Sequence, residues 1–264
     1  MSTAKPPATL YELSKGAATI TLNRPENRNA LSVELVDSLG ADLDRALADP
    51  QARVVVLTNV GNTFCAGADL KAVMETSGAS AQPSGGRSFL DIFDLIIDSP
   101  KPVIGRLAGH CLAGGLGLAA SCDISIAAAD ASFGFTEVRI GVAPAVISVV
   151  CLLKLRRADA LELFLTGERI SAARAAEVGL INRAVPMDEL DSAVAELVSK
   201  IVAGGPNALA VSKQLIARVP EMSRREGFDY AAPLSASLFA SAEGQEGIGA
   251  FRAKRKPSWI PQDS

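Results

Sequence analysis

The sequence predicts an α/β fold with partly parallel sheets and a helical C-terminal region. Short apolar runs alternate with helical segments through the first two thirds of the chain, and helical spacing dominates the last third. Strands that are separated by helices usually lie parallel in one sheet. No linker or internal repeat divides the 264 residues, so we expect one structural unit.

The first third is predicted to start with a hairpin, followed by a helix and a buried strand. Lys15-Gly16 separates two short strand-like runs, which is a hairpin signal. Leucines recur every four residues from Leu35 to Leu47, and Ser32 stands where an N-cap is expected. The predicted strands cover residues 9–13, 17–22 and 53–57, and the helix covers residues 32–48.

The middle third repeats the order of strand, glycine turn and helix. Strands are predicted over residues 102–107 and 122–127, and helices over residues 89–97 and from the second glycine turn to Ser121. Residues 76–87 are rich in Ser, Gly, Ala and Pro, so we expect a mobile loop there. In the last third, helices are predicted over residues 158–165, 172–177, 187–202, 206–218 and 223–239.

The composition excludes several classes of protein. Twenty-six basic and 29 acidic residues leave a net charge of −3, and 5% of residues are aromatic, so nucleic-acid binding is disfavoured. No secretory signal or membrane-length apolar run is visible. Cys65, Cys111, Cys122 and Cys151 lie in apolar surroundings without metal-ligand spacing. We therefore expect a cytoplasmic protein with reduced, buried thiols and with no metal, nucleic-acid or membrane partner.

Two glycine-containing turns are the first candidate functional features. One covers residues 63–70 and the other residues 113–117, and each follows a predicted strand and precedes a predicted helix. The first N–H groups of a helix have no partner within it, and glycine lets a ligand approach the backbone closely. Two such turns facing one point could direct two N–H groups at one developing oxyanion. Neither turn matches a phosphate-binding motif.

The third feature is Glu137, which lies in the apolar segment 133–144. Burial there would raise the pKa of its carboxyl group and make it a usable acid or base. The alternative is an exposed glutamate beside Arg139, in a surface ion pair that would contribute little. Arg139 could orient Glu137 or simply pair with it, and we favour pairing.

Taken together, these features resemble the enoyl-CoA hydratase/isomerase (crotonase) superfamily in their order and approximate spacing. The resemblance covers nearly the whole chain. Its motifs are residues 22–25, 28–31, 65–70, 113–115, 122–123, 165–167, 175–180 and 251–256.

The resemblance implies a spiral of ββα units over residues 1–200 and a helical trimerisation region over residues 201–264 within the same structural unit. It also implies an acyl-CoA substrate, no cofactor beyond the CoA moiety, a role in fatty acid metabolism, and a homotrimer or a dimer of trimers. By the family pattern, the N–H groups of Ala68 and Gly114 bind the thioester oxygen. Positions that match the CoA site are Arg28, Ala30, Ala66, Asp69, Leu70 and Lys71, while Phe251 and Lys254 match residues that approach the CoA of a neighbour.

The chain departs from the family pattern at Gly117. Hydratases of this family use two glutamates, and the first of these positions is glycine here, which leaves Glu137 alone. We favour hydration of a 2-enoyl-CoA, in which one carboxylate suffices if a single water molecule supplies both the hydroxyl group and the proton, or if another group helps. One alternative is an isomerase that moves a 3-double bond to position 2 with Glu137 as its sole base. A catalytically silent acyl-CoA-binding subunit is an alternative of another class.

Four further polar residues near the turns are predicted to have supporting roles. Asp69 is expected to cap the helix after its turn, and Asp123 is expected to be structural. His110, the single histidine, is expected to be packed or hydrogen-bonded. Cys65 has no visible histidine partner, so it is not expected to act as a nucleophile.

Overall fold

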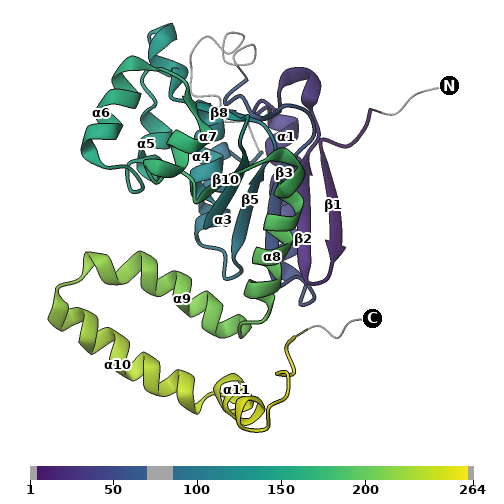
Figure 1. Cartoon of the computed structure of the whole chain (residues 1–264), viewed down its shortest axis with the longest axis vertical. Helices are drawn as coiled ribbons and strands as arrows, with labels where there is room; N and C mark the ends of the chain where they lie inside the picture. Colours follow the sequence, from purple (N-terminus) through teal and green to yellow (C-terminus); the bar gives the residue numbers. More distant parts are fainter. Residues whose placement is uncertain (1–4, 70–85, 261–264) are drawn as a thin grey trace.

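The computed structural model describes residues 5–69 and 86–260, whose strands form two sheets (Figure 1). The larger sheet has the order β1-β2-β3-β5-β7-β10. Its strands are β1 (Thr9–Ser14), β2 (Ala17–Leu22), β3 (Val54–Asn59), β5 (Val103–Leu107), β7 (Ile124–Ala128) and β10 (Arg183–Val185). Among the described strands of this sheet, only the pair β1–β2 is antiparallel.

The smaller sheet has the order β4-β6-β8-β9. It contains β4 (Thr63–Cys65), β6 (His110–Leu112), β8 (Ser132–Gly134) and β9 (Ile170–Ser171). The first three strands are parallel, and β9 is antiparallel to β8. Successive strand pairs β3–β4, β5–β6 and β7–β8 each give one strand to each sheet, so the chain winds as the predicted spiral of ββα units.

Helices surround the sheets and form the C-terminal region. They are α1 (Val33–Ala48), α3 (Phe89–Ile97), α4 (Gly114–Ser121), α5 (Ala145–Cys151), α6 (Arg157–Thr166), α7 (Ala172–Glu177), α8 (Leu190–Val202), α9 (Pro206–Arg218), α10 (Arg224–Ala240) and α11 (Ala242–Arg252). Short 3₁₀ helices are η1 (Pro25–Asn27), η2 (Thr136–Ile140), η3 (Met187–Glu189) and η4 (Val219–Glu221).

Strand β3 shows why an uninterrupted β-branched run predicts a buried strand. Val55 and Leu57 belong to the main core with α1 and α3, whereas Val54 and Val56 belong to a second core beneath α8. Alternate side chains point to opposite faces of a strand. Both faces of β3 are therefore covered by apolar side chains, and the whole strand is buried.

Local sequence signals placed two predicted elements correctly. The Ser32 hydroxyl accepts a hydrogen bond from the Leu35 amide at the start of α1, which confirms the predicted N-cap. At the β1–β2 turn, Lys15 and Gly16 both have positive φ angles, of 49° and 79°. Positive φ at both central residues is what a tight type I′ hairpin requires.

The C-terminal helices extend away from the two sheets (Figure 1). Helix α9 is fixed to the core by Lys213, whose Nζ lies 2.8 Å from Asp123 Oδ2. Neither α9 nor α10 has a buried residue, and Ile216, Phe228 and Phe239 are largely exposed. The predicted boundary after residue 200 falls inside α8, and α11 was not among the predicted helices. The trimerisation role of residues 201–264 stays a prediction.

Across the part of the chain that the structure describes, no single helix is long and apolar enough to cross a membrane; only the bent pair Met187–Val202 and Pro206–Glu221, with 104° between its halves, has the required length and composition. Most of the predicted mobile loop, residues 76–85, lies outside the described residues.

Candidate active site

Three of the predicted functional segments leave the same edge of the smaller sheet. Strands β4, β6 and β8 are parallel neighbours, so their carboxyl ends lie together. The chain continues from these ends into residues 66–68, 113–114 and 135–137. The carboxyl ends of parallel strands are a common place for a ligand site. The fold therefore brings the segments that contain Ala68, Gly114 and Glu137 to the same edge of this sheet, from positions up to 69 residues apart in the sequence.

The two glycine turns are in direct contact. Gly67 has a φ angle of +93°, and a β-carbon added to it would lie 2.8 Å from the Gly114 nitrogen and 2.9 Å from the Ala113 β-carbon. Only glycine fits such a close approach in this conformation. A β-carbon on Gly114 would lie 3.5 Å from the Ala68 nitrogen. The predicted convergence of the two turns is thus present in the structure.

The Ala68 and Gly114 amides are both available as donors. Gly114 is the first residue of α4, so its N–H has no acceptor within the helix. The Ala68 N–H donates to no backbone acceptor among residues 5–69 and 86–260. Ala68 is exposed and Gly114 is half-buried, which leaves room for an incoming oxygen. Two neighbouring free N–H groups are the elements of an oxyanion hole.

The segment before α1 supports the first of these turns. The Ala66 amide donates to Arg28 O at 3.1 Å, and the Leu31 amide donates to Gly67 O at 2.8 Å. Asn29 is fully buried, and its side-chain amide donates to Val60 O at 3.1 Å and to Thr63 O at 2.8 Å. Asn29 is a positioning residue that sequence reasoning missed, although its motif was noted.

Glu137 lies in η2 with a half-buried side chain. Its Oε2 atom is buried and has no hydrogen-bond partner in the described structure. Burial raises the pKa of this carboxyl group above its ordinary value, while a hydrogen bond from its own backbone acts weakly in the opposite direction. A partly buried carboxyl group with one unpartnered oxygen and a raised pKa is suited to proton transfer.

The expected pairing of Arg139 with Glu137 is wrong. Arg139 is exposed, and no ion pair joins the two residues in the described ranges. The aliphatic part of Arg139 instead faces Gly167, where a β-carbon would lie 3.2 Å from Arg139 Cγ. In a 3₁₀ helix, residues two apart point in different directions, so the two side chains diverge.

The structure brings together only some of the predicted CoA-site residues. Arg28, Ala30 and Ala66 lie in the two hydrogen-bonded segments beside Ala68, with Asp69 as the next residue. Leu70 and Lys71 lie outside the described residues, as does the helix that Asp69 was expected to cap. Binding of CoA by these positions stays a prediction.

Phe251 and Lys254 are not brought to this site within one chain. Both are exposed at the end of the C-terminal helices, where Phe251 is 85% exposed and ends α11 together with Arg252. Figure 1 shows α11 at the far end of the molecule from α4. Their predicted approach to the CoA of a neighbouring subunit is not tested by a single chain.

The remaining polar residues have the supporting roles that we expected. Asp123 Oδ2 accepts a hydrogen bond from the Val103 amide at 2.7 Å and pairs with Lys213. His110 Nδ1 accepts a hydrogen bond from the Ser132 amide at 3.0 Å. Burial raises the pKa of the Cys65 thiol to about 12, so this thiol is a poor nucleophile. All four cysteines are free and buried.

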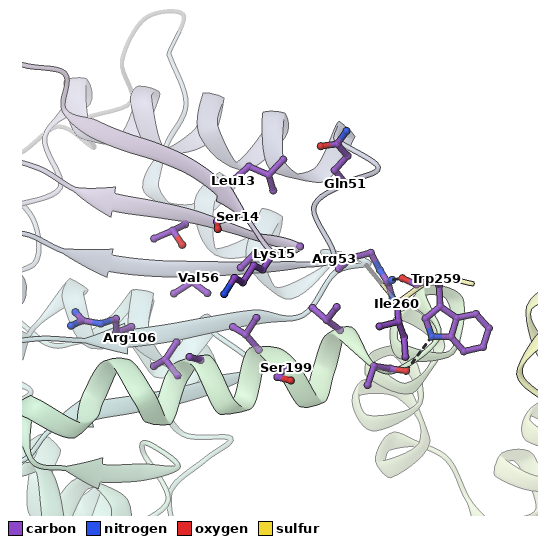
Figure 2. A pocket seen from close by; sticks show the side chains of 18 of the residues that line it. Leu13, Ser14, Lys15, Gln51, Arg53, Val56, Arg106, Ser199, Trp259 and Ile260 are labelled. Carbon is purple, nitrogen blue, oxygen red and sulfur yellow. Dashed lines mark hydrogen bonds between the residues drawn. The ribbon is translucent and has the colours of Figure 1, made fainter. Parts of the chain in front are cut away.

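The described residues contain no cluster of three or more His, Cys, Asp or Glu side chains that could hold a metal ion. A cavity of about 1450 Å³ lies elsewhere, between the larger sheet and α8 (Figure 2). Figure 2 shows Lys15, Arg53 and Arg106 around it, and its lining includes none of the predicted site residues.

Comparison with known proteins agrees with this geometry. The profile of the enoyl-CoA hydratase/isomerase family matches residues 12–262. The chain belongs to this family. A Thermus thermophilus relative with an enoyl-CoA hydratase name is 36% identical over 251 residues, which cover 94% of this chain and 99% of the relative.

Two solved structures of the family share the fold. Enoyl-CoA hydratase of Mycobacterium smegmatis has a TM-score of 0.85 and 34% identity, and the match covers 97% of this chain and 100% of that one. Pseudomonas aeruginosa AtuE has a TM-score of 0.88 and 34% identity over 96% and 100% of the two chains. The predicted crotonase-like α/β spiral is thereby confirmed for this member of the enoyl-CoA hydratase/isomerase family.

Proposed function

We propose that this enzyme adds water to a 2-enoyl-CoA and releases a 3-hydroxyacyl-CoA. The observation that carries the proposal is the contact between the two glycine turns, which presents the free Ala68 and Gly114 amides side by side. Attack at C3 of an unsaturated thioester moves negative charge onto the thioester oxygen. Preorganised N–H donors at that oxygen stabilise the enolate, and loss of one donor typically costs ~2.7–4 kcal/mol in the barrier.

Glu137 supplies the proton transfers. Its carboxylate accepts a proton from a water molecule while the water oxygen forms a bond to C3. The electron pair of the C2–C3 double bond moves into the enolate, whose oxygen rests on the two amides. Glu137 then returns the same proton to C2, and the enolate collapses to the thioester. One carboxyl group therefore completes the addition, and every atom added comes from one water molecule.

The hydratase assignment is preferred to both alternatives. Relatives with hydratase names and substantial coverage do not favour a dedicated isomerase, even though a single carboxyl group could also move a double bond. Family membership and the available amide pair place the chain among enzymes, which argues against a silent binding subunit.

Several finer properties are part of the same proposal. By the family pattern, the substrate's CoA is bound by Arg28, Ala30, Ala66, Asp69, Leu70 and Lys71, and no cofactor is needed beyond it. The enzyme forms a homotrimer or a dimer of trimers in the cytoplasm and acts in fatty acid metabolism. The exposed apolar side chains of α9 and α10, and the position of α11 at the far end of the molecule from α4 (Figure 1), support a C-terminal region that faces a neighbouring subunit.

A panel of unsaturated acyl-CoAs in heavy-oxygen water tests the reaction directly. We expect 2-enoyl-CoAs to gain one water molecule that carries the heavy oxygen, as measured by mass spectrometry. A product of unchanged mass formed from a 3-enoyl-CoA, without hydration of any 2-enoyl-CoA, would establish the isomerase instead. Absence of turnover across the panel would contradict an enzymatic role on these substrates.

A further inference from the structure

Gly117 occupies the position of the first of the two family glutamates, and neighbouring side chains leave no free space beside it. It is buried in α4, three residues after Gly114. A β-carbon at this position would lie 2.5 Å from Ile147 Cγ2, 2.7 Å from Phe93 Cζ and 3.0 Å from Phe93 Cε2. Distances below 3.0 Å force a shift of one partner. Two apolar side chains therefore occupy the space into which a glutamate side chain at this position would extend.

The two side chains that fill it are themselves fixed. Phe93 is 4% exposed and Ile147 is 3% exposed, and both belong to the main core. The Phe93 ring packs edge-on against Phe89 at a centroid distance of 5.8 Å. Because interiors are close-packed, neither side chain can retreat without displacing its neighbours.

These contacts join three helices at the oxyanion site. Phe93 comes from α3, Ile147 from α5, and the glycine between them from α4. Gly114 and Gly117 are three residues apart, so they lie on the same face of α4 in adjacent turns. The first turn of α4 is thus held where its leading N–H group faces the neighbouring Ala68 turn.

We propose that Phe93 and Ile147 are positioning residues that clamp α4 through the bare backbone at Gly117 and so fix the Gly114 amide for catalysis. The inference rests on the proposed function. It gives a structural role to Gly117, which replaces the first glutamate of the two-glutamate pattern. The glycine lets two apolar side chains pack directly on the backbone of α4. A misplacement of about 1 Å in an active site can cost ~10²-fold in rate, so the clamp has measurable consequences.

Gly117→Ala tests the clamp. We expect kcat for hydration to fall at least tenfold with little change in KM, because the added methyl group displaces Phe93 or Ile147 and shifts α4. The dependence of kcat/KM on pH, which reports the ionisation of Glu137, should not shift along the pH axis. Adding Phe93→Leu removes Cε2 and Cζ, and adding Ile147→Ala removes Cγ2, so either second change should recover at least fivefold of the lost kcat.

Ile92→Ala is the matched control, since Ile92 is a buried core residue on α3 next to Phe93. It should lower the melting temperature and leave kcat within twofold. If Gly117→Ala lowers only the melting temperature, or if the second changes give no recovery, the clamp is refuted. If Gly117→Ala does not fold, the single variants Phe93→Leu and Ile147→Ala test the clamp instead. Each should lower kcat more than Ile92→Ala does, and a smaller or equal loss would refute the inference. Absence of any hydration by the unchanged enzyme would instead defeat the proposed function.

Discussion

The two halves of the candidate site use different chemical groups: one uses main-chain N–H groups, and the other uses a side-chain carboxyl group. The oxyanion half consists of main-chain N–H groups at Ala68 and Gly114, which any residue except proline would supply. The acid–base half depends on one side chain, Glu137, whose Oε2 atom is buried and has no hydrogen-bond partner among the described residues. The first half is therefore sensitive to backbone geometry, and the second is sensitive to a single chemical group.

A large effect is expected from removing an N–H donor in the backbone half. Ala68→Pro lacks the N–H and should lower kcat by ~10²–10³-fold, the usual cost of losing one oxyanion donor. Ala68→Ser retains the N–H and should stay within a few-fold of the unchanged enzyme. Steady-state kinetics on a 2-enoyl-CoA, with circular dichroism to verify folding, measures both. A folded and fully active Ala68→Pro enzyme would remove the basis of the oxyanion site.

The side-chain half should respond to a change that preserves shape. Glu137→Gln cannot accept a proton, so kcat should fall by ~10²–10⁴-fold, the range for general acid–base catalysis, with KM nearly unchanged. Binding of a non-reactive acyl-CoA, measured by calorimetry, should persist. An equal loss of binding affinity would show that Glu137 holds the substrate and does not transfer its proton.

The pH dependence follows from the raised pKa of Glu137. Glu137 must be ionised to act as a base. The value of kcat/KM should therefore rise with pH through a single ionisation, whose pKa lies above the ordinary glutamate pKa of about 4.3. The folded protein binds this proton more tightly than the unfolded chain, so stability should fall as pH rises from the unfolded to the folded pKa. Above that range, Glu137→Gln should melt at a slightly higher temperature than the unchanged protein. If Glu137→Gln instead melted at a lower temperature than the unchanged protein at neutral pH, the burial of Glu137 Oε2 without a partner would be contradicted.

The smallest expected effect belongs to Arg139. Because its guanidinium forms no ion pair with Glu137 in the described structure, Arg139→Ala should change kcat less than twofold and leave the pH profile in place. A pH profile shifted by this substitution would show that Arg139 acts on Glu137 in solution.

Sequence patterns predicted those parts of the fold that have local causes. Leucine spacing and Ser32 placed α1, and the β-branched run placed β3. Strands β4, β6 and β8 have three residues each, which is too short for any periodicity to appear. Helix α11 contains Gly244, Gly247 and Gly249, which weaken its intrinsic propensity, and it is stabilised by the Ser241 cap and the buried Ala250.

The sequence by itself determined the family, the two glycine turns and the single carboxyl candidate, because these are matters of residue type and order. Only the tertiary structure decided that the turns touch, that Glu137 is separated from Arg139, and that Phe93 and Ile147 fill the space beside Gly117. These outcomes depend on contacts between segments far apart in the chain. Close packing of the interior fixes such contacts, and no local pattern contains that information.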